Sequence, residues 1–159
     1  MKPTLLTVRS LILPVLMAAL LALQGCTCNN GDIGRWFGTW TVEQILTDGE
    51  PYAAYEHNMV WKFQNSVFSM QLINPDPGIH DRQQRWGSWS ETDGELILDF
   101  SHSDNIDAPG EGIYAPFAVS LLNRGGISAL RITESKGNRM TLGFTSAAGI
   151  KVTYIINKQ

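Results

Sequence analysis

The sequence predicts an all-β domain, an antiparallel up-and-down meander of about eight strands closed into a barrel. About eight short segments carry apolar residues, most of them alternating with polar residues, which is the period-2 pattern of half-buried strands. Several connections between them are too short for crossover helices, so neighbouring strands should be antiparallel. Closure also removes the two open edges that a flat meander of this kind would expose.

The first 25 residues are typical of an export signal that is removed from the mature protein. Lys2 and Arg9 make a positive start, and the apolar run 11–23 is shorter than the roughly 20 residues that span a bilayer as a helix. Residues 23–26, Leu-Gln-Gly-Cys, resemble a bacterial lipobox, the cleavage site of signal peptidase II. The resemblance implies cleavage before Cys26 and acylation of Cys26. The alternative is a secreted protein in which Cys26 is an ordinary thiol.

A lipidated Cys26 would anchor the protein to a membrane through its acyl chains. Two or more chains make such an anchor stable, because each buried CH₂ contributes about 0.8 kcal/mol. Thr27 stands where Asp signals inner-membrane retention in enterobacteria, which favours the outer membrane. Residues 26–34 are expected to form the lipidated Cys and a tether, because 28–32 are polar and contain Gly. Their lack of a dense acidic cluster favours the periplasmic face. Cys28 would be the single remaining thiol, so no intramolecular disulfide is expected.

Residues 35–159 are expected to form a single domain, by the usual relation between length and domain number. Without Lys2 and Arg9, Lys+Arg falls from 12 to 10 against 15 Asp+Glu, and the formal net charge moves from −3 to −5. Nucleic-acid binding relies on basic patches that neutralise phosphates. An acidic domain without a Lys/Arg block is therefore not expected to bind nucleic acid.

The expected strands follow one another with turn signals between them. The first, 38–47, places Trp40 and Val42 on one face but Ile45 on the other, which indicates a bulge or burial on both faces. Residues 113–122 are ambiguous, because their first half suits an edge strand and 117–122 suits one helical turn. The remaining expected strands are 59–64, 68–72, 83–91, 96–100, 127–133, 140–144 and 150–156.

The pattern resembles the calycin superfamily, and specifically the small lipocalin-like domains of Bacteroidetes lipoproteins. The resemblance rests on Gly-Thr-Trp at 38–40, on Gly-Ser-Trp at 87–89 and on the closing segments 140–142 and 152–154. It covers nearly all of the mature chain. The chain ends three residues after Ile156, without the C-terminal helix of larger lipocalins, which leaves the match at superfamily level.

The resemblance implies roles for particular side chains. Trp40 should lie at the closed base of the barrel under an Arg from a late strand, for which Arg131 and Arg139 are the candidates. A small hydrophobic or amphipathic ligand should occupy the barrel, with loops 52–57 and 104–111 gating its mouth. The ligand-binding candidates are Trp61, Phe63, Phe68, Met70, Trp86, Leu98, Phe144 and Tyr154.

The alternative is that these side chains fill the interior themselves, as in other barrels of eight strands. The protein would then be a non-enzymatic interaction module with an unknown protein partner, such as an envelope assembly factor or a hydrolase inhibitor. Interior volume distinguishes the two hypotheses, because small-molecule sites usually enclose several hundred Å³.

Catalytic and metal-binding motifs are absent from the sequence. No nucleophile elbow, zinc-protease motif, P-loop or dinucleotide fingerprint occurs, so neither enzymatic activity nor a cofactor is expected. His102, Asp104 and Asp107 form the one local cluster with metal-like character, but their spacing lacks the Gly and distal Glu of an EF-hand. We therefore interpret this cluster as a solvated loop and expect no metal. The pairs 56–57 and 80–81, each a His beside an acid, are interpreted as surface residues.

Overall fold

The computed structural model describes residues 34–74, 82–102, 107 and 110–159. The chain divides into two units, Met1–Arg35 and Trp36–Gln159, and the barrel lies within the second. The predicted signal 1–25, Cys26 and the tether up to residue 33 lie outside the described residues, as do His80, Asp81 and Asp104. Among the described residues, no helix has the length and apolar character needed to cross a bilayer.

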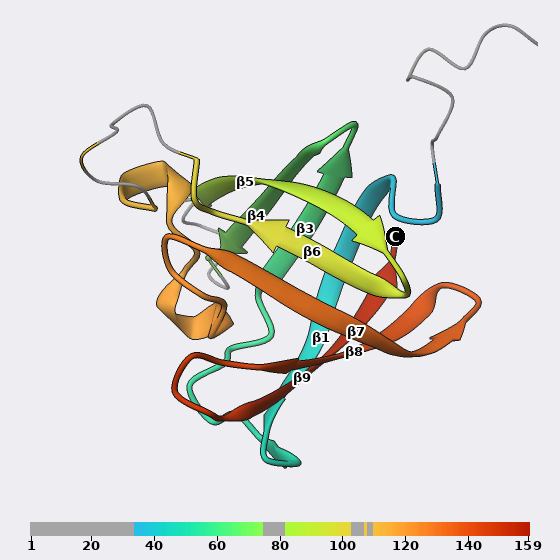
Figure 1. The fold of residues 1–159 in the computed structure, drawn as a ribbon. Helices are drawn as coiled ribbons and strands as arrows, with labels where there is room; N and C mark the ends of the chain where they lie inside the picture. Colours follow the sequence, from blue (N-terminus) through green and yellow to red (C-terminus); the bar gives the residue numbers. More distant parts are fainter. Residues whose placement is uncertain (1–33, 75–81, 103–106, 108–109) are drawn as a thin grey trace, which may run out of the picture. The chain divides into compact units, whose positions relative to one another are not determined.

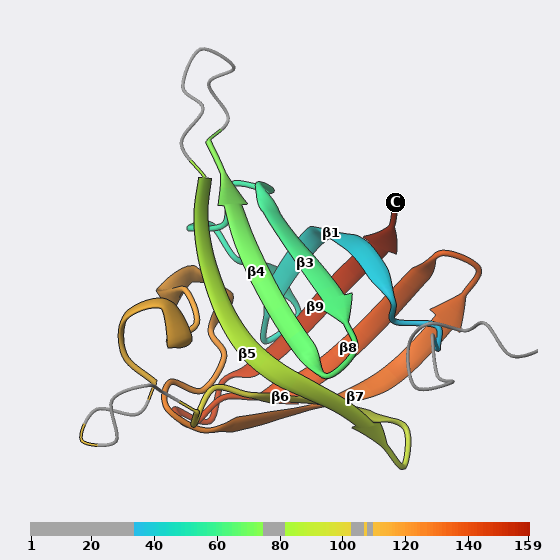
Figure 2. The same cartoon turned by 90° about the horizontal axis from the view of Figure 1, so that it is seen from above.

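The described part of the second unit is an antiparallel sheet that curls until its last strand meets its first (Figures 1 and 2). Each strand pairs with the next in the order β2-β1-β3-β4-β5-β6-β7-β8-β9, and β1 also pairs with β9. The strands are β1 (Gly38–Thr47), β2 (Glu50–Pro51), β3 (Met59–Gln64), β4 (Val67–Ile73), β5 (Arg82–Thr92), β6 (Glu95–Asp99), β7 (Ile127–Lys136), β8 (Arg139–Thr145) and β9 (Lys151–Lys158). Because β2 has two residues and pairs only with the end of β1, the other eight strands form the barrel, as the sequence predicted.

The connections alternate between the two ends of the barrel, because successive strands run in opposite directions. The turns at 65–66, 93–94 and 137–138 lie at the end where β1 begins. Asp93 and Gly94 have φ angles of 52° and 78°, as an Asp-Gly hairpin turn requires. The connections between β1 and β3 and between β6 and β7 lie at the other end. The second of them contains the two 3₁₀ turns, η1 (Gly112–Tyr114) and η2 (Ala118–Ser120). The interpretation of 117–122 as a helical turn is thus confirmed, and the edge strand is not formed.

A bulge explains the mixed pattern of the first strand. The register between β1 and β9 shifts between Val42 and Gln44, so the strand gains one residue there. This residue, Glu43, returns Ile45 to the inner face beside Trp40 and Val42, and all three are buried. The predicted bulge is confirmed, and Gln44 lies on the exposed face.

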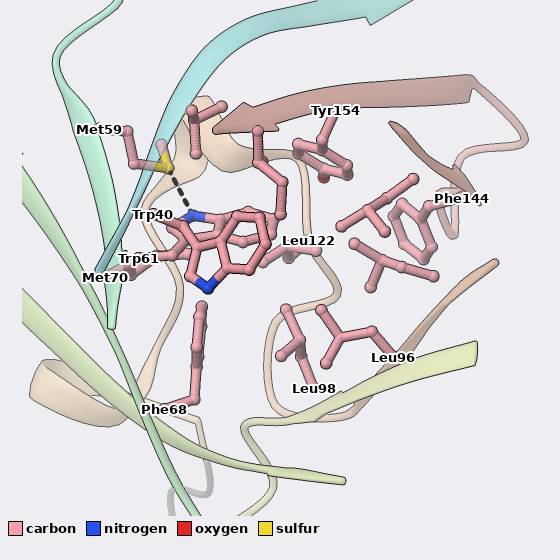
Figure 3. Close-up of a cluster of buried hydrophobic side chains, with 14 of the residues drawn as sticks. Trp40, Met59, Trp61, Phe68, Met70, Leu96, Leu98, Leu122, Phe144 and Tyr154 are labelled. Carbon is pink, nitrogen blue, oxygen red and sulfur yellow. Dashed lines mark hydrogen bonds between the residues drawn. The ribbon is translucent and has the colours of Figure 1, made fainter. Parts of the chain in front are cut away.

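The barrel interior is a cluster of apolar side chains, shown in Figure 3. Aromatic rings from β3, β4 and β9 contact one another there. The ring centroid of Trp61 lies 5.6 Å from that of Phe68 and 5.2 Å from that of Tyr154. The ring centroids of Phe63 and Phe68 lie 5.1 Å apart. Each fully buried side chain of this kind contributes about 1.5–3 kcal/mol, so the cluster is the main source of stability for the domain.

Trp40 closes the barrel at the end where β1 begins. Its side chain is buried, and Nε1 donates to the backbone oxygen of Trp36 at 2.8 Å. The cation above its ring is Lys158, whose Nζ lies 5.6 Å from the ring centroid. Lys158 takes this position because the β1–β9 register sets it opposite Trp40, and a cation over an indole face is electrostatically favourable.

The prediction that Arg131 or Arg139 covers Trp40 is therefore wrong. Both arginines have mostly exposed side chains and form ion pairs on the surface of the barrel. Arg131 Nε lies 3.8 Å from Glu95, and Arg139 Nη2 lies 3.6 Å from Glu43. The position over Trp40 is set by strand register, which the identity of the residue does not reveal.

We expect Gly87→Ala to destabilise the barrel by about 1–3 kcal/mol, the usual cost of overpacking. A Cβ at this β5 position would lie 2.7 Å from the backbone oxygen of Asp99 and 3.1 Å from the ring of Phe100. The matched control is Gly143→Ala in β8, where the nearest atom would be Thr133 Cγ2 at 3.5 Å. That control should be neutral or stabilising by about 0.4–1 kcal/mol. Urea unfolding of both variants measures the difference, and equal effects would contradict the close approach at Gly87.

Candidate functional site

Seven of the eight side chains predicted to bind a ligand are buried in the barrel interior. Phe144 is 7% exposed, and the other six are 0% exposed. A side chain that faces a ligand-sized cavity keeps surface that a water molecule can reach. Their complete burial therefore means that the space around these six is filled by the protein itself. The six are Trp61, Phe63, Phe68, Met70, Leu98 and Tyr154.

Trp86 is the exception, since it lies on the outer face of the barrel and is 36% exposed. It pairs with Ser69, whereas its neighbours Arg85 and Gly87 pair with the inward-facing Met70 and Phe68. Because side chains alternate along a strand, the residues that face inward are Arg85 and Gly87. The prediction that Trp86 lines the interior is wrong. The prediction followed the apolar character of Trp86, whereas the alternation of side chains along β5 places Trp86 outside.

Residues 112–122, here called the plug, cover the mouth opposite Trp40. They form η1 and η2, drawn in orange beside β5 in Figure 1. Phe117 and Leu122 are buried with the core cluster, and Leu122 is drawn among the core side chains in Figure 3. The plug thus closes the mouth with apolar side chains of the chain itself.

Two of the predicted ligand-binding residues hold the plug in place. Tyr154 Oη donates to the backbone oxygen of Ser120 at 2.5 Å, and the backbone N–H of Phe117 points at Met70 Sδ at 3.4 Å. Burial raises the pKa of Tyr154 far above its ordinary value, so its phenol remains a neutral donor. These interior groups are engaged with the plug in the structure.

The end of the plug is fixed to the neighbouring strands by Asn123. Its backbone N–H donates to Ser128 Oγ at 2.9 Å and its side-chain amide to the backbone oxygen of Ile127 at 2.8 Å. Asn123 Oδ1 accepts from the backbone N–H of Ala147 at 3.2 Å. The plug is therefore tied to β7 and to the β8–β9 turn through one polar side chain.

Loop 52–57, one of the two predicted gates, supports the β1 bulge. Tyr55 Oη donates to the backbone oxygen of Val42 and accepts from the N–H of Met59 at 3.3 Å. His57 Nδ1 lies 2.5 Å from the backbone oxygen of Glu43. Desolvation raises the pKa of Tyr55 to about 12, which keeps the donor protonated. The loop therefore satisfies backbone oxygens at the bulge. Most of the other predicted gate, 104–111, lies outside the described residues.

A cleft of about 260 Å³ opens between the plug and β5. Its apolar wall comes from the plug, and Arg85 and Arg124 also line it. Arg85 Cζ lies 4.9 Å from the centroid of the Phe117 ring. Sequence reasoning missed both arginines. The available signal was that Arg85 shares its side of the strand with Gly87 and Trp89, which makes it a polar residue at an inward position.

Of the metal-like cluster His102, Asp104 and Asp107, Asp104 lies outside the described residues. His102 Nε2 lies 3.3 Å from Asp99 Oδ2, and the backbone N–H and Oγ of Ser101 donate to Asp99 Oδ1 at 2.8 and 2.5 Å. Burial raises the pKa of Asp99. The hydrogen bonds from Ser101 and the neighbouring His102 lower it by more, so the pKa lies below its ordinary value. In the part of the chain that the structure describes, no three His, Cys, Asp or Glu residues gather as metal ligands would.

Two solved structures share the architecture of this chain. A lipocalin-like protein from Bacteroides uniformis ATCC 8492 aligns with a TM-score of 0.53 and 17% identity, over 79% of this chain and 100% of the other. The fold is lipocalin-like. An uncharacterized protein from Bacteroides eggerthii DSM 20697 shares the lipocalin-like fold with a TM-score of 0.56 and 19% identity, over 78% and 99% of the two chains. No family model and no curated protein matches the sequence. The likeness at these identities concerns the fold alone.

We expect Tyr154→Phe to loosen the plug. The substitution leaves the buried backbone oxygen of Ser120 without its donor, which should lower the free energy of unfolding by about 1–3 kcal/mol. Amide hydrogen exchange should become faster within 117–122. Tyr52→Phe is the matched control, because Tyr52 is half-buried against the same core, and a change of less than about 0.5 kcal/mol is expected there. Unchanged exchange in Tyr154→Phe would contradict the role of Tyr154 in holding the plug.

Proposed function

We propose that the mature protein is a lipid-anchored, non-enzymatic protein of the bacterial envelope that binds a small amphipathic molecule at the plugged mouth of its lipocalin-like barrel. The observation that carries this proposal is the cleft between the plug and β5. It joins an apolar wall to two cationic side chains, and such a combination suits a molecule with one apolar and one polar end.

The filled interior favours a ligand at the mouth over one inside the barrel. The six completely buried candidates leave no space for a guest beside them while the plug is closed. The cleft, at about 260 Å³, is smaller than the roughly 300–1,000 Å³ of sites that enclose a whole drug-sized ligand. It suits a polar headgroup with a short apolar stem, and a longer stem would have to displace the plug.

The lipobox-like residues 23–26 support the anchor. Acylation of Cys26 would hold the barrel at a membrane surface without a spanning segment. Thr27 and the tether composition favour the outer membrane and its periplasmic face. At that location the protein would meet amphipathic molecules that partition between membrane and water.

Cys26→Ser should abolish incorporation of an alkyne palmitate analogue and release the protein from the membrane fraction. The reason is that lipid attachment requires the thiol of this residue. Cys28→Ser is the matched control, since it removes the neighbouring thiol and should leave both labelling and fractionation unchanged. Persistent labelling of the Cys26→Ser protein would contradict the proposal that the protein is a lipoprotein.

Native mass spectrometry of residues 29–159, purified without detergent, should show a bound mass that solvent extraction recovers as an amphipathic compound. Ala118→Trp should reduce its occupancy, because Ala118 is exposed and lines the cleft. Ala129→Trp, on the exposed outer face of β7, should retain the compound. A bare mass in the parent protein, with no change in Trp emission on adding fatty acids, would contradict ligand binding.

The second candidate function is a protein-interaction module with a filled core. The complete burial of the interior favours it, and so does a trough of about 670 Å³ across the outer faces of β7, β8 and β9. Arg131 and Lys151 line this trough together with Glu95, a mixed-charge surface of the kind that a protein partner can match. If this candidate holds, Ala129→Trp should weaken partner binding and Ala118→Trp should not.

A further inference from the structure

We infer that Arg85 and Arg124 form a site for the anionic end, a carboxylate or phosphate, of an amphipathic molecule whose apolar stem lies against the plug. The inference deepens the proposed function and rests on it.

Arg85 occupies a position where a barrel normally places an apolar side chain. Its register partner is the fully buried Met70, and Gly87 and Trp89 follow on the same side of β5. The guanidinium donates one hydrogen bond, from Nη1 to the backbone oxygen of Gln84 at 3.2 Å, and stacks on Phe117. A guanidinium carries five N–H donors, so most of the hydrogen-bonding capacity of Arg85 is left for a ligand.

Neither cleft arginine has an acidic partner among the described residues. Among the described residues, Arg131 pairs with Glu95 and Arg139 with Glu43, and no described carboxylate lines the cleft. The acid nearest to the plug in sequence, Glu111, is exposed and does not contribute to the lining. In a chain that is acidic overall, two arginines that line one cleft without a carboxylate partner among the described residues form a local site of positive potential.

The chemistry of the cleft selects the ligand class. A guanidinium matches the two oxygens of a carboxylate or phosphate with parallel N–H donors. Arg85 is half-buried, and reduced solvent exposure strengthens its attraction for an anion relative to a fully solvated pair. The remaining wall is apolar and belongs to Ala115, Pro116, Phe117 and Leu122. An anion with an apolar stem satisfies both parts of the cleft.

A structural role explains only half of this arrangement. Stacking on Phe117 accounts for Arg85 as a support of the plug. Arg124, however, is exposed, and it follows the segment that Asn123 already ties down. Its position on the same cleft is accounted for by a shared anion.

The test uses the full-length lipoprotein in phosphatidylcholine nanodiscs and isothermal titration calorimetry. The probes are hexanoate, hexyl phosphate, hexanol and inorganic phosphate. We expect hexanoate and hexyl phosphate to bind more tightly than hexanol or inorganic phosphate. The Arg85→Gln/Arg124→Gln double variant should lose about tenfold or more in affinity for the two anionic amphiphiles, as expected when charged hydrogen bonds are removed. Its affinity for hexanol should not change.

Arg131→Gln is the charge-matched control for the single variant Arg124→Gln, because each removes one positive charge and Arg131 lies on the outer face of β7. It should retain the affinity of the parent protein. The single variant Arg124→Gln keeps the test valid if Arg85→Gln unfolds the plug, since Arg124 is exposed, and thermal unfolding of each variant checks this. Affinity of the anionic amphiphiles should also fall as salt is raised, because the attraction is screened.

The outcomes separate this inference from the function on which it rests. If hexanol binds as tightly as hexanoate and the double variant changes nothing, the anion site is overturned while ligand binding stands. If inorganic phosphate binds as tightly as hexyl phosphate, the site recognises a free anion. The inference that the ligand is an amphiphile is then overturned. If none of the probes binds to the parent protein, both the site and the proposed function fail.

Discussion

The pairing of β1 with β9 is the contact on which the rest of the barrel depends. It joins the first and last strands of the meander and removes both sheet edges, which would otherwise be open to aggregation. The same register sets Lys158 over Trp40 at the closed end. It also creates the bulge at Glu43, whose neighbouring backbone oxygens are then bound by loop 52–57. One long-range pairing therefore shapes both ends of the domain.

Interior volume is the second constraint. A barrel of eight strands encloses only enough space for its own side chains or one small ligand. Here large aromatic residues from β3, β4 and β9 fill that space, and the plug adds Phe117 and Leu122. Because a packed interior cannot also hold a guest, the ligand site that we propose lies at the edge of the plug. Tyr154 and Met70, which were predicted to bind a ligand, instead contact the plug from the barrel interior.

Charge distribution gives the mouth its chemical character. The chain carries an excess of acids, and Arg131 on β7 and Arg139 on β8 are paired with glutamates. The cleft differs because its two arginines face apolar plug residues and lack carboxylate partners among the described residues. An anchored protein with such a mouth would be suited to amphipathic anions near a membrane surface, and the anchor and the cleft would then serve the same function.

The sequence predicted the eight strands of the barrel, their order and their antiparallel pairing, because alternation and Asp-Gly turns are local signals. It also indicated the bulge in the first strand and the burial of Trp40. Only the three-dimensional structure shows which residue covers Trp40, on which face Trp86 lies, and whether the interior is filled. Each of these depends on register between distant strands or on where a long connection folds back, as with the plug. Such contacts join residues far apart in the chain, and no local pattern encodes them.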